Sequence, residues 1–373
     1  MHKPKLLILV LTTVSAVGCG EDDLPDSADT GVSEMDGGKP DASPSAGDGG
    51  LDAAPKPPMN DASLIDAGSV DNGEALIARG RYLTSNIYPC GSCHTPRDAG
   101  VPDLSRLLSG VDCWTDTVPA DGGVGCLSSK NLTNHATGLK NLSDSEVKDL
   151  FLKGLAPDGK ALHPQMPYAV LGNMNDHDAN AIVAYLRSLP PVEHMVAPNQ
   201  PPFNTPPAAP AARWPEADIP RPRPDYVDQA AALRGRYLAG NIGNCLDCHT
   251  PRDPATNTPI TGKTFQGGRT FGNNPVAWAP NLTPDATGIK TWTVEDVLRA
   301  LKFGEDADQD HSKLCGPMPV GPTGAYGGIT DADARDIGHY LLSIPPVEHM
   351  VAGDCMPAAP DAGARDAGAA DGG

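Results

Sequence analysis

Two stretches of the chain, CGSCHTPRD from Cys90 to Asp98 and CLDCHTPRD from Cys245 to Asp253, repeat one another and decide how the rest of the sequence is interpreted. In each stretch two cysteines are separated by two residues, and a histidine follows directly. Two thiols at this spacing can each add to a vinyl group of one haem, and the adjacent histidine then lies under the iron as its proximal ligand. The sequence therefore predicts two covalently attached haem c groups, bound by Cys90, Cys93, His94, Cys245, Cys248 and His249.

Two other chemistries also use closely spaced cysteines. A thioredoxin-like redox pair needs a strand followed by a helix, a context that this sequence does not predict. A structural zinc site needs a second pair of ligands some tens of residues away. With 9 Cys and 10 His in 373 residues, a chance match to the motif is expected on the order of 0.01 times per chain. Two matches therefore favour covalent haem.

The similarity between the two halves extends well beyond the motifs. Arg79–Asp98 matches Arg234–Asp253 at 14 of 20 positions, and PPVEHMV recurs at Pro190 and Pro345. A nearly constant offset indicates that each copy is one complete domain, so two copies of one function are expected. We predict domains at 73–196 and 228–355, joined by a semi-rigid proline-rich linker at 197–227.

Each copy is predicted to contain three main helices joined by loops, which makes the fold mostly α. The helices are expected at about 73–83, 143–154 and 176–189 in the first copy, and at 228–238, 293–304 and 330–344 in the second. Capping boxes at Ser143 and Thr293 start the middle helices, and glycines end them. Three short helices provide a thin core, which suggests that something other than side chains fills the centre.

The sixth ligand of the iron separates an electron carrier from a catalyst. Aligning the copies places Met166-Pro167 opposite Met318-Pro319, 72 and 69 residues after the respective histidines. A thioether ligand favours ferrous iron and raises the potential, and the proline stiffens the loop that presents it. Because the two methionines recur in register, we expect Met166 and Met318 to be distal ligands rather than core filler. His163 is less favoured, since its counterpart falls in an altered, longer loop.

These features together resemble the class I cytochromes c. The resemblance rests on the Cys-x-x-Cys-His motif after a helix, NLTPDATGIKTWTVEDV at Asn281–Val297, the Met-Pro dipeptide and a last helix ending YLLSIPPV at Tyr340–Val347. It covers residues 74–195 and 228–351. The resemblance is strongest to the multi-haem cytochrome subunits that take electrons from membrane-associated dehydrogenases in the bacterial periplasm.

The resemblance also implies details of packing. In that family a glycine of the first helix lies against an aromatic residue of the last, which implies Gly80 on Tyr185 and Gly235 on Tyr340. The first copy departs from the pattern, because it lacks the proline and tryptophan of the second copy and carries an insertion at Val111–Ser129. Many such subunits carry three haems, whereas this chain has two motifs.

The ends of the chain differ in composition from the repeats. Two lysines precede the apolar run Leu6–Val17, and Cys19 follows small residues as in a bacterial lipoprotein box. We expect residues 1–19 to be a secretory signal with a lipid anchor at Cys19, and ordinary signal cleavage is the alternative. Residues 20–72 carry 13 acidic and 2 basic side chains and few large apolar ones. They are predicted to form a disordered acidic tether, and 356–373 a short disordered tail.

Most of the formal net charge of −19 comes from these ends, because residues 73–353 carry only −7. We interpret the charge as a source of solubility and spacing rather than as a docking surface. The expected partners are redox proteins, namely a dehydrogenase, an oxidase or another cytochrome, together with a membrane reached through the lipid anchor. No nucleic-acid partner is expected.

Four further cysteines form an even set in a chain predicted to be exported to an oxidising compartment. Their positions within each copy suggest that Cys113 pairs with Cys126 and Cys315 with Cys355, with free thiols as the alternative.

The sequence as a whole predicts an electron-transfer protein of the periplasm or cell surface rather than an enzyme. Both haems are expected to have His/Met ligation and to carry single electrons between partners. The alternatives are a catalytic dihaem enzyme of the peroxidase or dehydrogenase type, or a haem-based sensor. Either alternative needs an open iron position, which the presence of a methionine in both copies does not favour.

Overall fold

Helices and turns make up most of the described chain, as the sequence predicts. The structure is a computed structural model that describes residues 73–98, 100–114, 125–254, 258–271, 277–307, 314 and 317–351. The α-helices are α1 (Gly73–Tyr82), α2 (Gly91–His94), α3 (Asp144–Lys153), α4 (Tyr168–Leu171), α5 (Asp176–Ser188), α6 (Gln229–Arg236), α7 (Cys245–Cys248), α8 (Val294–Phe303) and α9 (Asp331–Ser343). The expected signal, tether and C-terminal tail lie outside the described residues.

Shorter elements connect these helices. Two π-helices are η2 (Leu83–Ile87) and η5 (Tyr237–Asn241), and the 3-10 helices are η3 (Leu104–Arg106), η4 (Glu216–Asp218), η6 (Thr261–Lys263) and η7 (Ala325–Gly328). Three antiparallel two-stranded ladders pair β1 (Arg97–Asp98) with β2 (Val101–Pro102), β3 (Val111–Trp114) with β4 (Leu127–Ser129), and β5 (Thr270–Phe271) with β6 (Ala277–Trp278). Among the described helices, none has the length and apolar character needed to span a bilayer.

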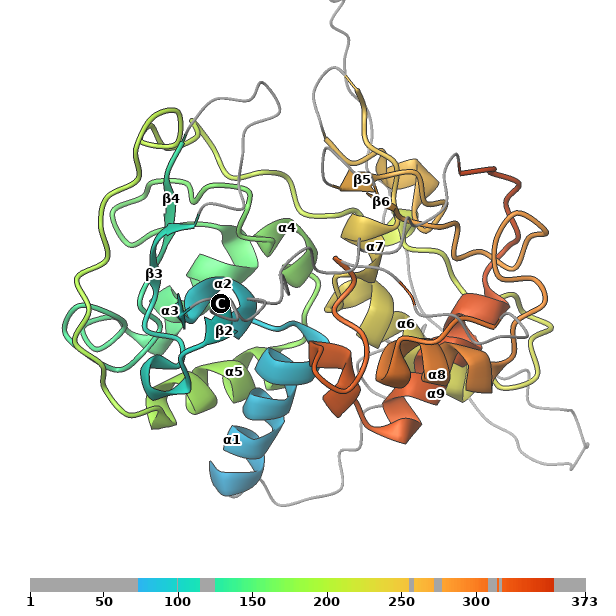
Figure 1. Ribbon diagram of the computed structural model, residues 1–373, viewed down its shortest axis with the longest axis horizontal. Coiled ribbons are helices and arrows are strands. Elements are labelled where there is room, and N and C mark those ends of the chain that lie inside the picture. Colours follow the sequence, from blue (N-terminus) through green and yellow to red (C-terminus); the bar gives the residue numbers. More distant parts are fainter. Residues whose placement is uncertain are drawn as a thin grey trace, which may run out of the picture. The chain divides into compact units, whose positions relative to one another are not determined.

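One helix arrangement occurs twice in the chain. Helix α1 packs on α5, and helix α6 packs on α9 (Figure 1). At each crossing a glycine allows the two backbones to approach, because an added methyl group would lie 2.8 Å from Cβ of Tyr185 at Gly80 and 2.8 Å from Cβ of Tyr340 at Gly235. The glycine–aromatic contacts that the resemblance implies are therefore confirmed.

The middle helices begin and end where the sequence predicts. Both capping boxes form, with Ser143 capping α3 and Thr293 capping α8. Each helix ends at a glycine with left-handed backbone, φ 62° at Gly154 and 69° at Gly304. An L-residue with a side chain would be strained in this conformation, which is why glycine stands at both positions.

The first helix of each copy is not α-helical throughout. The sequence predicts α-helices over 73–83 and 228–238, but α1 gives way to η2 after Tyr82 and α6 gives way to η5 after Arg236. A π-helical turn carries one more residue than an α-helical turn and commonly marks a functional position. Here each π-helix lies a few residues before a Cys-x-x-Cys-His motif.

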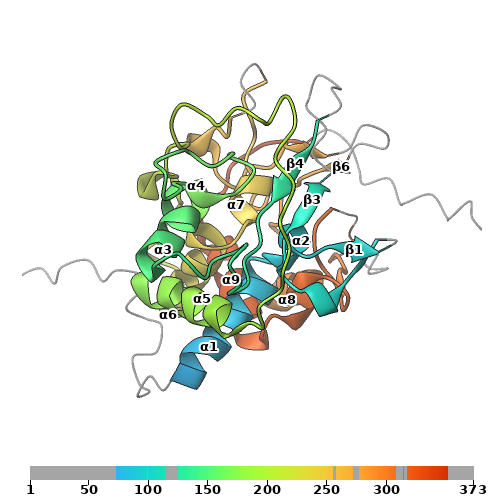
Figure 2. The same ribbon diagram turned by 90° about the vertical axis from the view of Figure 1, so that its left-hand side faces the viewer.

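The two described ends of the segment that the sequence indicates as an insertion pair as antiparallel strands. Strands β3 and β4 lie side by side (Figure 2), and Cys113 is joined to Cys126 in a disulfide with the Cα atoms 4.6 Å apart. In the second copy the shorter strands β5 and β6 pair at the corresponding place. The other expected pair, Cys315 with Cys355, lies outside the described residues.

The proline-rich segment between the copies is anchored to both. The backbone N–H of Trp214 donates to the carbonyl of Ala169 (2.8 Å) in the first copy. The buried guanidinium of Arg236 in the second copy donates to the carbonyls of Ile219 (2.9 Å) and Pro220 (3.1 Å). These contacts hold parts of the linker against both copies.

Candidate haem-binding sites

Each Cys-x-x-Cys-His motif occupies one short helical turn. The backbone N–H of His94 donates to the carbonyl of Cys90 (3.0 Å), and that of His249 donates to the carbonyl of Cys245 (2.8 Å). The turn brings the two cysteines and the histidine of each motif together. Among the described residues, none of the four motif cysteines is joined in a disulfide.

The two histidine rings are oriented in the same way. Nδ1 of His94 lies 2.8 Å from the carbonyl oxygen of Lys130, and Nδ1 of His249 lies 2.9 Å from that of Pro280. Because a carbonyl only accepts, Nδ1 must carry the hydrogen, and a neutral ring then has its lone pair on Nε2. The burial of both rings lowers their pKa, that of His249 to about 4, so neutral rings are favoured at pH 7. Both imidazoles are suited to ligate a metal through Nε2.

The electrostatics of the thiols argue against a redox-active cysteine pair. Burial raises the pKa of Cys90 to about 12, of Cys245 to about 11 and of Cys248 to about 12. A catalytic thiol of the thioredoxin type has instead a lowered pKa. The zinc alternative has no support in the described ranges either, since they contain no cluster of three or more His, Cys, Asp or Glu residues able to hold a metal.

Met166 and Met318 occupy equivalent, half-buried positions against the apolar core. Each lies at the start of a turn, because the carbonyl of Met166 accepts from Tyr168 N (2.9 Å) and that of Met318 accepts from Val320 N (2.9 Å). Met195 and Met350, in contrast, are 78% and 76% exposed. Of these four methionines, the structure thus places only the first two in packed surroundings.

Most of the other histidines have local structural roles. Nδ1 of His194 lies 2.9 Å from the carbonyl oxygen of Ser109, and Nδ1 of His349 lies 2.6 Å from that of Gln266. The ring of His163 packs edge-on against Phe203, with centroids 5.1 Å apart. His311 lies outside the described residues.

Two tyrosines beside the motif cysteines are not among the residues that the sequence predicts for the sites. The buried Tyr326 hydrogen-bonds the thiol of Cys245, and burial raises its pKa well above the usual range. Burial also raises the pKa of Tyr88, followed by the charge of Asp247 and then the thiol of Cys248. The two cysteines of the first motif raise the pKa of Tyr88 by a smaller amount, so Tyr88 interacts electrostatically with thiols of both motifs. In the sequence, the position of Tyr88 two residues before Cys90 was the feature that could have indicated its place beside the motif.

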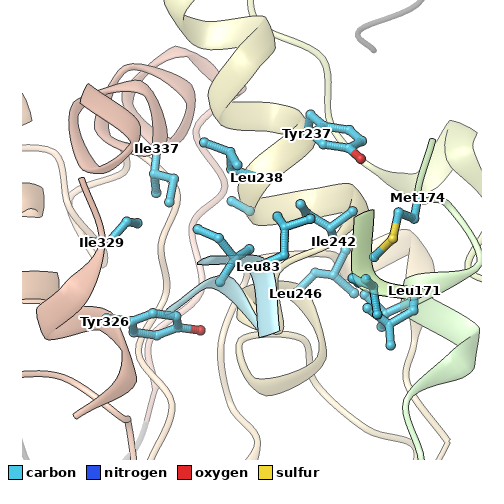
Figure 3. Packing of buried hydrophobic residues seen from close by; sticks show 14 of the residues in the cluster. Leu83, Leu171, Met174, Tyr237, Leu238, Ile242, Leu246, Tyr326, Ile329 and Ile337 are labelled. Carbon is cyan, nitrogen blue, oxygen red and sulfur yellow. The ribbon is translucent and has the colours of Figure 1, made fainter. Parts of the chain in front are cut away.

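The apolar core around the motifs contains side chains from both copies. Figure 3 shows Leu83 of η2 among Leu238, Ile242 and Leu246, with Tyr326 nearby. Together with half-buried thiols, neutral imidazoles and thioethers, this apolar environment fits a covalently attached haem better than a solvated metal ion.

A comparison with known families agrees with this chemistry. The profile of the cytochrome c family matches residues 77–190. The chain contains a cytochrome c domain. Such a domain indicates haem c, and the matched residues hold the first motif, the first-copy methionine and all of α5.

The cytochrome also resembles longer proteins over most of its length. It is 28% identical over 279 residues to the fructose dehydrogenase cytochrome subunit of Gluconobacter japonicus, covering 72% of this chain. It is 28% identical over 287 residues to the cytochrome c subunit of a quinone alcohol dehydrogenase of Gluconobacter oxydans, covering 74% of this chain. The chain spans 52% and 56% of these two relatives, which is about half of their length. A diheme cytochrome c-type of Cereibacter sphaeroides is 24% identical over 266 residues, which are 69% of this chain and 83% of the relative.

Proposed function

We propose that this cytochrome is an exported dihaem protein that carries single electrons between redox partners. One haem is attached to Cys90 and Cys93 with His94 as proximal ligand. The other is attached at the second motif. The main support is that both histidines donate from Nδ1 to a backbone carbonyl at the same position of the repeat. The equivalent orientation of both histidine rings supports one haem at each motif.

The chain positions its own groups for this role. The carbonyls of Lys130 and Pro280 fix the orientation of the imidazoles and strengthen them as donors, since each accepts the Nδ1 hydrogen. Met166 and Met318 would supply thioether ligands to the haem iron, which would raise its potential. Haem iron, when bound, exchanges one electron between its ferrous and ferric states.

The proposal extends to architecture and location. The copies are cytochrome c domains at 73–196 and 228–355, joined by the linker 197–227 and carried on the acidic tether. The chain is exported to the periplasm or cell surface and anchored at Cys19.

A dehydrogenase is proposed as the electron donor. Two relatives are named as cytochrome subunits of dehydrogenases, which supports this partner class. An oxidase or another cytochrome would accept the electrons.

Haem stoichiometry tests the proposal. The exported protein should carry two haems per chain that survive acid and organic extraction, because thioethers are covalent. The ferrous protein should not bind carbon monoxide at neutral pH if methionines fill both distal positions. One haem per chain would contradict the dihaem proposal. Stoichiometric carbon monoxide binding would favour a catalyst or a sensor.

A further inference from the structure

A tyrosine of the first copy contacts the last helix of the second. The hydroxyl of Tyr82 donates to the carboxylate of Asp333 (2.5 Å) and accepts from the backbone N–H of Thr330 (3.2 Å). Thr330 is the N-cap of α9, and its side chain accepts from the N–H of Asp333 in the first turn. Tyr82 therefore binds the N-terminus of α9.

The same contact is made in the reverse direction. The hydroxyl of Tyr237 donates to the carboxylate of Asp178 (2.8 Å) and accepts from the backbone N–H of Asn175 (3.3 Å), the N-cap of α5. In sequence Tyr237 is the repeat counterpart of Tyr82, and Asp178 and Asn175 are the counterparts of Asp333 and Thr330. Each half thus donates a hydrogen bond from one tyrosine hydroxyl to a carboxylate of the other half.

Both hydroxyls remain protonated donors at neutral pH. Burial, followed by the charge of Asp333, raises the pKa of Tyr82, and burial with the charge of Asp178 raises that of Tyr237. A hydrogen bond from a hydroxyl to a carboxylate is stronger than one between neutral groups. The four side chains therefore form two charge-assisted bonds between the copies.

The tyrosines lie at the start of the segments that lead to the motifs. Tyr82 directly precedes η2, and Tyr237 is the first residue of η5. The side-chain amide of Asn86 in η2 also crosses to the second copy, donating to the carbonyl of Ala325 (3.0 Å). Leu83 packs in the same apolar cluster as residues of η5 and α7 (Figure 3). Anchoring the tyrosines thus anchors both motif segments to one another.

We propose that Tyr82 and Tyr237 are positioning residues that hold the two haem-bearing segments at a fixed separation for electron transfer from one haem to the other. This inference rests on the proposed function, because it requires a haem on each motif. The step moves one electron between the two haems, with no bond made or broken and no other reactant consumed. Its rate falls steeply with separation and depends on a fixed geometry.

The two contacts differ in burial. Tyr237 is 1% exposed and Asp178 is fully buried, and Asp178 also binds Arg79 with two bonds of 2.9 Å. Tyr82 and Asp333 are half-buried. Removing the hydroxyl of Tyr237 leaves a buried carboxylate one donor short. Water can hydrogen-bond the half-buried carboxylate of Asp333 in place of Tyr82, although the direct bond between the copies is then lost. The loss of Tyr237 should therefore have the larger effect.

The test compares Tyr82→Phe, Tyr237→Phe and the double variant in the full exported protein. The control is Tyr226→Phe, which removes a hydroxyl 3.1 Å from Nδ1 of His339, within the second half of the chain. We would measure the haem content by intact mass and the two midpoint potentials. We would also measure the rate of electron transfer between the haems after rapid photoreduction, and the magnetic coupling of the ferric haems. A conservative variant, Asp333→Asn, keeps an acceptor for Tyr82 and is compared with Asp333→Ala.

Wild-type protein with two haems is the starting condition, and a single haem would overturn the proposed function itself. With two haems present, the double variant should keep both and their potentials but transfer electrons between them about tenfold more slowly or worse, with weaker coupling. Tyr226→Phe should match wild type, and Asp333→Asn, which keeps an acceptor for Tyr82, should lie closer to wild type than Asp333→Ala. A wild-type rate and coupling in the double variant would overturn the inference. If the double variant does not accumulate, the same outcomes for Tyr82→Phe and Asp333→Ala decide.

Discussion

Gly80 of α1 packs directly against Tyr185 of α5, so that a methyl group on the glycine would lie 2.8 Å from Cβ of the tyrosine and would overlap the carbonyl of Ala181. The crossing at Gly235 and Tyr340 repeats this relationship. Each crossing joins the helix that precedes a Cys-x-x-Cys-His motif to the last helix of the same copy. The backbone there cannot yield locally, because both partners lie inside helices.

Gly80→Ala is therefore expected to destabilise the protein, although alanine is normally the better helix former. Overpacking against a helix backbone should lower the free energy of unfolding by about 3 kcal/mol. Denaturant unfolding of the haem-loaded protein, followed by helical circular dichroism, measures this change.

Gly262→Ala is the matched control, because an added methyl group there would meet nothing within 4 Å. Its free energy of unfolding should stay near that of wild type. Equal stability of the two variants would show that the helix crossing is looser than the structure indicates.

Removing the disulfide between Cys113 and Cys126 should destabilise the first copy without affecting haem attachment. The bond closes a short loop, so the loss of its chain-entropy effect should cost the double variant Cys113→Ser/Cys126→Ser about 3 kcal/mol. Hydrogen exchange should increase in β3 and β4 and remain unchanged in β5 and β6. Loss of a haem from this variant would instead assign the cysteines a role in the site.

Local features of this fold could be predicted from the sequence, and contacts between the copies could not. The capping box at Ser143 and the glycine stop at Gly154 depend on neighbours in the chain, and the structure has both. The contact of Tyr237 with Asp178 depends on how two repeats pack, and no pattern within either repeat signals it. In sequence, Tyr82 and Tyr237 are simply the same residue at equivalent positions of the two copies.

The π-helices were not predicted either. The pattern around Leu83 suits an α-helix, whereas Leu83–Ile87 is a π-helix, and Leu83 lies in one apolar cluster with residues of the second copy. Trp214 stands in the proline-rich run that the sequence predicts to be a semi-rigid spacer, and it is 3% exposed because it packs into the apolar core.

The cap of α3 should make stability depend on pH. The N–H of Ser143, and then its hydroxyl, donate to Glu146 and lower the pKa of this carboxyl below its ordinary value. A carboxyl with a lowered folded-state pKa stabilises the fold above its unfolded pKa, and this contribution is lost as the pH falls through the folded value. In Ser143→Ala the Glu146 pKa, followed by NMR of the reduced protein, should move back toward its ordinary value. An unchanged pKa would mean that the hydroxyl does not contribute.

The distal ligands give the prediction that separates a carrier from a catalyst. If Met166 and Met318 both bind iron, oxidised protein should show a weak near-infrared sulfur-to-iron band, about half of which is lost in Met166→Ala and the other half in Met318→Ala. Each variant should gain carbon monoxide binding at one haem and fall in potential, because the thioether favours ferrous iron. Met195→Ala is the matched control, since this side chain is 78% exposed and its loss should change neither the band nor the potentials. A full band in Met318→Ala would show that the second haem has another ligand, and the second copy would then be the place to look for catalysis or sensing.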